Sequence, residues 1–188
     1  WQTPDTPFMS FAFWQALADT GATGEQAGWL PIFVLVHRVA DSQSDSSIDH
    51  ADHNENHNEN HSENHSAINE AAQTVAHPVA VLPVFLKGHH RGEFVFDHSW
   101  AEAYARYGVD YYPRLVTSVP YTPITGQRLW LAKGETLTTD IIKAAIAGVD
   151  DIAQQVGASS WHGLFVTPEL AKIATASMPT DIEIAHLL

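Results

Sequence analysis

The clearest pattern in the chain is a run of apolar residues at helical spacing. These apolar positions step by four, four, three and four residues: Ile141, Ala145, Val149, Ile152 and Val156. The spacing places them on one face of an amphipathic helix. Thr139 or Asp140 is a candidate N-cap, and Gly157 is a candidate C-terminal stop. We therefore expect a long helix here, with its apolar stripe packed against a sheet.

Three shorter stretches also predict helices. Residues 11–19 follow Ser10, which favours the N-cap position. Another helix is expected from Ser99 to Gly108, because Ser99 and a glutamate three residues later form a capping box. The aromatic residues of this helix share one face: Trp100, Tyr104 and Tyr107. A further helix at residues 168–177 opens with a proline at its first position.

Apolar runs rich in branched and aromatic residues predict strands. The strongest are residues 29–38 and 79–87, in which Pro31 and Pro83 suggest bulges or edge positions. Weaker strand-like runs follow at residues 94–97, 115–121, 127–131, 161–166 and 182–185. In the first half of the chain strands follow one another directly, whereas in the second half helices separate them. This order predicts an α/β domain with a mixed, mainly antiparallel sheet flanked by helices.

An acidic, low-complexity segment, residues 41–75, separates the first two strong strands. Residues 41–70 hold eight of the 22 acidic residues and no Lys or Arg. Histidine recurs there every four residues, at His53, His57, His61 and His65. Because the segment has few apolar residues to bury, burial cannot offset the entropy of ordering it. We expect a long insertion loop between the two strands.

The histidine repeat has two interpretations. Histidines four residues apart lie on one face of a helix, which is a metal-binding spacing. Asn-rich sequence forms helices poorly, however, and no hydrophobic stripe would dock such a helix. We expect a solvated loop that binds zinc or nickel only adventitiously, with no specific metal site. A His-rich metal-binding protein is the weaker alternative.

Composition and charge narrow the possible functions. The 188 residues suit one domain of ordinary size. A net charge of −13 argues against duplex DNA or an anionic membrane as the main partner. The lack of cysteine excludes disulfides, Cys-ligated zinc and thiol catalysis. No apolar run approaches the ~20 residues of a spanning helix, so we expect no membrane span and a cytoplasmic location.

The densest polar stretch of the chain, residues 87–100, contains four candidate binding residues: His89, Arg91, Glu93 and Asp97. Histidine can act as an acid or base, and arginine can hold a carboxylate or phosphate in a two-pronged contact. In an extended strand Glu93 and Asp97 would lie on one face about 13 Å apart. That distance is too long for a carboxylate pair acting on one bond. The alternative is a polar strand end with a solvated turn.

A second group of candidates lies further along the chain. Aromatic, arginine and threonine side chains in a Pro-stiffened stretch form a plausible ligand-facing edge: Tyr112, Arg114, Tyr121, Thr122, Thr125 and Arg128. Aromatic packing at the rim of a sheet explains them equally well. His162 follows two serines at a strand start, where histidine is more often structural. The chain has neither a G-x-S-x-G elbow nor a Walker-type loop.

Five ordered blocks resemble the FemAB-like family of peptidoglycan biosynthesis, which is assigned to the acyl-CoA N-acyltransferase (GNAT) superfamily. The blocks read PFMSFAFWQAL, GWLPIF, LPVFLKGHHRGEFVFDHSWAEAYARYG, YYPRLVTSVPYTPITGQRL and SSWHGLFV. The resemblance covers residues 6–178 except the acidic loop, which departs from the family. It implies a single GNAT-like domain over residues 1–188. It also implies that this domain is the first half of a longer tandem protein, with a second GNAT-like half in the same gene product.

The resemblance implies the N-terminal half of an acyl- or aminoacyl-transferase whose acceptor is an amine, such as that of a cell-wall precursor. Single GNAT enzymes hold the diphosphate of coenzyme A on a loop that opens a helix. The comparable stretch here, ITGQRLWLAKGET, lacks that pattern. We therefore expect this half to bind no cofactor and to be inactive alone, with acyl-CoA or an aminoacyl donor used by the full-length protein. The alternative is a non-catalytic ligand-binding module on the same fold.

Within this half, the resemblance implies binding roles rather than a catalytic base. Three arginines would bind anionic groups: Arg91, Arg114 and Arg128. Three residues would contact polar groups of the acceptor: His89, Glu93 and Asp97. Aromatic and hydroxyl side chains would line the pocket: Tyr112, Tyr121 and Thr122. We expect the segments at residues 89–97 and 121–128 to meet at one cleft.

Overall fold

The computed structural model describes residues 1–2, 6–39, 76–95 and 98–177. The chain divides into two compact units, residues 38–77 and the remainder, and the fold below is that of the remainder. Three predictions lie outside the described residues: the histidine repeat in the acidic loop, the role of Asp97 and the strand at residues 182–185. Among the described helices, none is long and apolar enough to cross a membrane.

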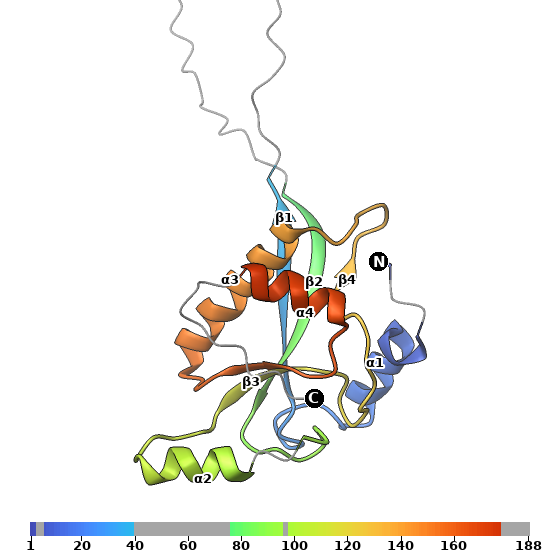
Figure 1. The fold of residues 1–188 in the computed structure, drawn as a ribbon. Helices are drawn as coiled ribbons and strands as arrows, with labels where there is room; N and C mark the ends of the chain where they lie inside the picture. The colour runs from blue at the N-terminus through green and yellow to red at the C-terminus, as the bar shows by residue number, and fades with distance from the viewer. Residues whose placement is uncertain (3–5, 40–75, 96–97, 178–188) are drawn as a thin grey trace, which may run out of the picture. The chain divides into compact units, whose positions relative to one another are not determined.

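Helices and strands alternate along the chain much as the periodicity predicts (Figure 1). After a 3₁₀ turn, Pro7–Met9, the order is α1 (Phe11–Asp19), β1 (Leu30–Arg38), β2 (His77–Lys87), α2 (His98–Arg106), β3 (Arg114–Thr117), β4 (Trp130–Leu131), α3 (Thr139–Val156), β5 (Trp161–Gly163) and α4 (Pro168–Ser177).

The strands form one mixed sheet in the order β1-β2-β3-β5, and β4 pairs with β2 beside this path. β2 is antiparallel to both β3 and β4, whereas β3 is parallel to β5. The α/β class and the mainly antiparallel sheet are therefore confirmed. Pro31 lies on β1, the end strand of the order, as its sequence suggests.

Pro83 lies instead on the central strand β2. It falls between the two ladders that share one side of β2: Ala80 and Val81 pair with β4, and Phe85 begins the pairing with β3. A missing N–H is tolerated there because neither β3 nor β4 pairs with residue 83. The carbonyl of Pro83 accepts a hydrogen bond from Thr117 Oγ1 at 3.2 Å.

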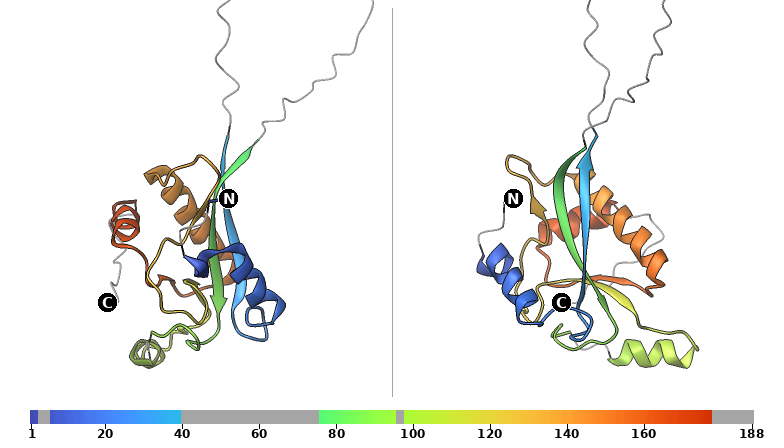
Figure 2. Two further views of the ribbon diagram at one scale, coloured as in Figure 1. Left: turned by 90° about the vertical axis from the view of Figure 1, so that its right-hand side faces the viewer. Right: turned by 180° about the vertical axis from the view of Figure 1, so that it is seen from behind.

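Both faces of the sheet are covered. α3 and α4 lie on one face and α1 on the other (Figure 2). Leu82 and Val84 of β2 belong to the core cluster that also includes Val149 of α3. Phe85 of the same strand stacks on Trp14 of α1, with ring centroids 5.7 Å apart. Burial on both faces explains why β2 reads as an almost continuous apolar run rather than an alternating one.

The predicted long helix is confirmed as α3, but its cap is one residue earlier than predicted. Thr138 is the N-cap, and its side chain accepts a hydrogen bond from the Ile141 amide at 3.3 Å. Thr139 and Asp140 are already inside the first turn. Gly157 ends the helix with φ 63°, a left-handed conformation that glycine adopts without a Cβ penalty.

Several predicted strand boundaries are wrong. The chain forms no strand at residues 94–95, because Phe94 has φ 60° and cannot continue an extended conformation. β3 and β5 are shorter than predicted, and left-handed residues follow them: Tyr121 with φ 58° and Phe165 with φ 53°. The capping box is also wrong, since α2 begins before Ser99 and encloses it.

Candidate functional site

Three charged side chains meet where β2 ends and β3 begins. Lys87 is the last residue of β2 and pairs in register with Arg114, the first residue of β3. Glu93 comes from the β2–α2 loop, residues 88–95. Lys87, Glu93 and Arg114 are 0%, 2% and 1% exposed, respectively. We call these three residues the buried charge cluster.

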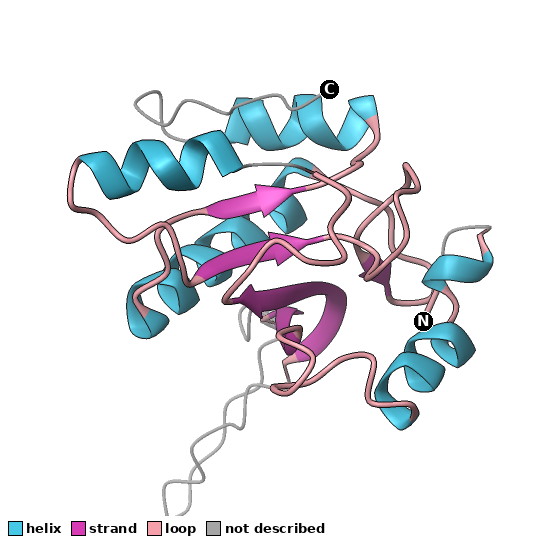
Figure 3. Ribbon diagram, turned by 90° about the horizontal axis from the view of Figure 1, so that it is seen from below, coloured by secondary structure: helices cyan, strands magenta, loops and turns pink. Residues whose placement is uncertain are grey.

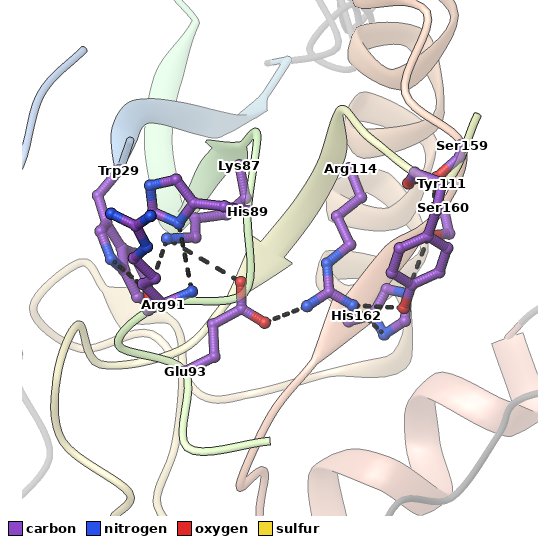
Figure 4. Close-up of polar contacts among 10 residues, drawn as sticks. All are labelled: Trp29, Lys87, His89, Arg91, Glu93, Tyr111, Arg114, Ser159, Ser160 and His162. Carbon is purple, nitrogen blue, oxygen red and sulfur yellow. Dashed lines mark hydrogen bonds and ion pairs between the residues drawn. The ribbon is translucent and has the colours of Figure 1, made fainter. Parts of the chain in front are cut away.

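The ammonium group of Lys87 is enclosed by three kinds of partner (Figure 4). It lies 3.7 Å from the centroid of the Trp29 ring, donates a hydrogen bond to the Arg91 carbonyl at 3.0 Å and lies 4.0 Å from Glu93 Oε1. Burial lowers the pKa of Lys87 from 10.5 to about 8, with the Glu93 charge opposing this fall and Arg114 adding to it.

Arg114 connects the charge cluster to β5 and to the chain before β3 (Figure 4). Its Nη2 is hydrogen-bonded and ion-paired to Glu93 Oε2. Its Nη1 donates to the Tyr111 hydroxyl at 2.7 Å and lies 3.4 Å from His162 Nδ1. The guanidinium also lies 5.6 Å from the centroid of the Tyr112 ring. Arg114 is thus held by groups from three parts of the chain.

His162 makes a polar contact through each of its ring nitrogens. Its Nδ1 lies 3.4 Å from Arg114 Nη1, and its Nε2 lies 2.8 Å from Ser160 Oγ. The neighbouring Ser159 Oγ donates to the Tyr111 carbonyl at 2.5 Å. These contacts hold the imidazole ring between Arg114 and the start of β5.

The buried charge cluster holds the β2–α2 loop by its backbone. The Arg91 carbonyl accepts from Lys87 Nζ and also from Trp29 Nε1 at 3.2 Å. The Arg91 amide donates to His89 Nδ1 at 3.2 Å. The Arg91 side chain itself is exposed, beside a cavity of about 330 Å³ that is lined by His90, Arg91, Gly92, Phe94 and Val95. Burial, together with the charges of Lys87 and Arg91, lowers the pKa of His89.

The remaining candidates fall in two places. Tyr121 adjoins the β2–α2 loop, because its amide donates to the Gly92 carbonyl at 3.1 Å. Thr122 donates to the Pro120 carbonyl at 3.2 Å, and Thr125 is exposed. The segments at 89–95 and 121–128 therefore meet at the Tyr121 end.

Arg128 is buried away from this junction and donates to the Leu164, Ile124 and Phe165 carbonyls at 3.2, 2.5 and 2.9 Å. Burial lowers the pKa of Arg128 to about 10. Its contacts are those of a residue that joins two loops, and its binding of an external anion stays a prediction.

Sequence reasoning identified Glu93 and Arg114 of the cluster as candidate site residues but missed Lys87 and Trp29. Trp29 is fully buried and packs edge-to-face on Phe85, with ring centroids 5.2 Å apart. The available signal was the position of Lys87 two residues after Phe85, on the same face of a strand that is otherwise apolar. An enclosed lysine there needs an acid or hydrogen-bond acceptors nearby, and an aromatic ring can stabilise its charge further. Among the described residues, no group of three His, Asp or Glu could hold a metal ion.

Comparison with known proteins identifies a family for this chain. The FemAB-like family model, described as peptidoglycan biosynthesis/recognition, matches residues 1–182. No curated protein and no solved structure matches the chain. The match spans nearly all of the chain, including the charge cluster, the β2–α2 loop and the three helices that cover the sheet. The chain therefore belongs to the FemAB-like family of peptidoglycan biosynthesis/recognition.

Proposed function

We propose that this chain is the acceptor-binding, N-terminal half of an acyl- or aminoacyl-transferase with a GNAT-like fold. The acceptor is a peptidoglycan precursor, whose stem peptide carries carboxylates and an amine. One observation carries the proposal: a peptidoglycan-family chain presents an exposed arginine, Arg91, beside a cavity and fixes its backbone through two buried donors. A guanidinium carried on a fixed backbone is suited to two-pronged recognition of a carboxylate.

In the proposed reaction the acceptor amine attacks an activated acyl carbonyl, and the acyl group passes to nitrogen as the amine loses a proton. Arg91 binds a stem-peptide carboxylate and thereby orients the amine, while His89 contributes a polar contact at the same loop. Lys87, Glu93 and Arg114 are enclosed, so they hold the loop rather than contact the acceptor. A second GNAT-like half of the gene product supplies the activated donor.

The long helix of this half does not fit the diphosphate of coenzyme A. The Thr138 side chain already accepts the Ile141 amide, and Asp140 places a carboxylate in the first turn. A bound diphosphate would meet that negative charge at the point where helix N–H groups attract anions. No step is therefore assigned to coenzyme A in this half.

The second candidate function is recognition of peptidoglycan without group transfer. The enclosure of the buried charge cluster favours it, because these three ionisable groups cannot reach a bound amine. The family description includes recognition as well as biosynthesis. Both candidates require that the β2–α2 loop bind the acceptor.

The test is calorimetric titration of the 188-residue chain with a stem peptide that carries no sugar. We expect saturable binding that Arg91→Gln weakens about tenfold, as expected for loss of one charged hydrogen-bonded contact. Arg106→Gln is the matched control, because Arg106 is an exposed α2 arginine whose side chain is 78% accessible. Unchanged affinity in Arg91→Gln refutes the acceptor site. Mass gain on the peptide, measured with the full-length gene product in the presence and absence of an acyl donor, separates transfer from recognition.

A further inference from the structure

A row of aromatic side chains on α2 has no part in the proposed acceptor site. Trp100, Tyr104 and Tyr107 are three, four and seven residues apart, so they share one face of the helix. We call them the α2 aromatic face. Trp100 is 50% exposed and Tyr107 is 85% exposed, and α2 buries no residue. Exposed aromatic surface on this scale points to a ligand.

The C-terminal end of α2 shapes a hollow beside this face. Tyr104, Tyr107 and Val109 line an apolar cavity of about 170 Å³. A Schellman motif fixes the hollow: the Val109 amide donates to the Tyr104 carbonyl at 3.1 Å, the Gly108 amide donates to the Ala105 carbonyl at 3.1 Å, and Gly108 has φ 69°. Because Gly108 turns the chain back, Val109 lies against the helix rather than extending away from it.

The chemistry of the face suits a neutral ligand with both apolar and polar sides. Its three side chains carry no charge, and each aromatic ring ends in a polar N–H or O–H group. The charged pair of α2, Glu102 and Arg106, is 3.7 Å apart and lies on another side of the helix. An aromatic ring has a negative face, which complements the partly positive C–H face of a sugar ring. The hydroxyl and N-acetyl groups of such a sugar stay in water.

The α2 aromatic face is also continuous with the buried charge cluster. The Tyr104 ring packs edge-to-face on Tyr111, with centroids 5.1 Å apart, and the Tyr111 hydroxyl accepts from Arg114 at 2.7 Å. Arg114 in turn binds Glu93, which belongs to the β2–α2 loop. In Figure 1 α2 lies below the sheet, and Figure 3 shows the molecule from that end. A ligand on the face would therefore lie on the helix that directly follows the proposed acceptor loop.

We propose that the α2 aromatic face is a subsite for the glycan part of peptidoglycan. One sugar ring stacks on Tyr107 over the hollow, and the next ring but one along the glycan stacks on Trp100, about 10 Å away along the helix axis. The inference rests on the proposed function, because the acceptor loop would take the stem peptide. It extends that function, because this half would bind the sugars of the ligand as well as its peptide.

The experiment titrates the 188-residue chain with oligomers of N-acetylglucosamine, which carry no peptide. Binding is followed by calorimetry and by saturation-transfer NMR. We expect saturable binding that Tyr107→Ala and Trp100→Ala each weaken about two- to tenfold, the range for one aromatic stacking contact. Tyr107→Phe keeps the ring and should retain most of the affinity. Arg106→Ala on the charged side of α2 should leave binding unchanged, and circular dichroism checks that each variant keeps its helices.

The outcomes separate this inference from the proposed function. If the oligomers do not bind, or bind wild type and Tyr107→Ala alike, the glycan subsite is refuted. Binding of the sugar-free stem peptide is measured on the same variants and depends on Arg91, so it can persist when the glycan subsite fails. Analytical sedimentation of the chain without ligand tests whether the face is instead a contact between two copies. Self-association that Tyr107→Ala abolishes would identify the face as a protein interface and overturn the proposal.

Discussion

Replacing Glu93 by Gln tests how the buried charge cluster is stabilised. The substitution keeps the shape and removes the negative charge that lies between two enclosed cations. Lys87 and Arg114 are register partners, so their positive charges then face each other across neighbouring strands. Removing one partner from a buried ion pair costs about 3–5 kcal/mol, against a total stability of about 5–15 kcal/mol. We expect the free energy of unfolding to fall by about 3–5 kcal/mol near neutral pH.

Lys87→Met provides the comparison, because it removes one cation and leaves the Glu93–Arg114 pair. It loses the contact with the Trp29 ring and the hydrogen bond to the Arg91 carbonyl, a cost of about 1–3 kcal/mol. With Lys87 replaced, Glu93→Gln leaves one buried cation rather than two. Its cost in that background should therefore be smaller by about 1–3 kcal/mol, the usual range for residues in one network. Urea unfolding of the four proteins, followed by circular dichroism, measures this coupling.

The same experiment at higher pH has a defined sign. The pKa of Lys87 is about 8 in the folded chain, below its usual 10.5. Between those values the unfolded chain binds a proton that the folded chain lacks, so this group raises the free energy of unfolding as pH rises. Glu93 is the charge that raises the Lys87 pKa, so Glu93→Gln lowers that pKa further. The cost of Glu93→Gln should shrink as pH rises from about 7 to 9. A cost under about 1 kcal/mol, or a cost independent of both pH and Lys87, would refute the reasoning.

Three further substitutions test the fold around the site, each by urea unfolding. Arg128→Gln should cost about 2–4 kcal/mol because it breaks the hydrogen bonds of a buried guanidinium to three carbonyls, and an equal loss in Arg106→Gln would contradict this assignment. Thr138→Ala should cost about 1 kcal/mol of unfolding free energy because α3 loses its N-cap. The control Thr139→Ala, inside the first turn, should cost clearly less. Gly148→Ala places a Cβ 2.7 Å from Val34 Cγ1, so overpacking of about 1–3 kcal/mol should exceed the helix gain of about 0.5–1 kcal/mol. In a Val34→Ala background the clash is absent, so Gly148→Ala should instead raise the free energy of unfolding.

Elements with strong local signals could be predicted from the sequence, whereas several of their ends could not. The periodicity of α3 and the glycine at its C-terminus specify the helix without reference to the rest of the chain. Its N-terminus offers Thr138, Thr139 and Asp140 in succession, each a competent cap, so local sequence does not choose among them. The left-handed residues Phe94 and Tyr121 interrupt the chain without a glycine signal, so nothing local predicts them. At Tyr121 the choice is tertiary, since its ring packs against Trp29 with centroids 5.5 Å apart.

The candidate site divides in the same way. Glu93, Arg114 and His162 could be identified as polar residues in apolar surroundings, but nothing local indicates that they meet. Their meeting depends on the pairing of β2 with β3 and of β3 with β5, and these long-range pairings set the register. Trp29 is 62 residues from Arg91, whose carbonyl it binds. The binding roles of Arg91 and Tyr112 toward an acceptor stay predictions, because they concern a ligand rather than the fold.

The position of the buried charge cluster explains why charge is used at a place where apolar residues would pack as well. Enclosing ions has a large desolvation cost, and apolar residues of similar volume are often equally stable in such places. Apolar residues would leave the Arg91 carbonyl without its donor from Lys87 and the loop without the tie from Glu93 to β3. The β2–α2 loop would then lose two of its contacts with the sheet and keep those with Trp29 and Tyr121. A charged cluster is directional, so it holds one loop conformation where an apolar core would accept several. The cluster therefore explains how the backbone of an exposed arginine keeps one position on a loop, from which its side chain can reach the proposed acceptor.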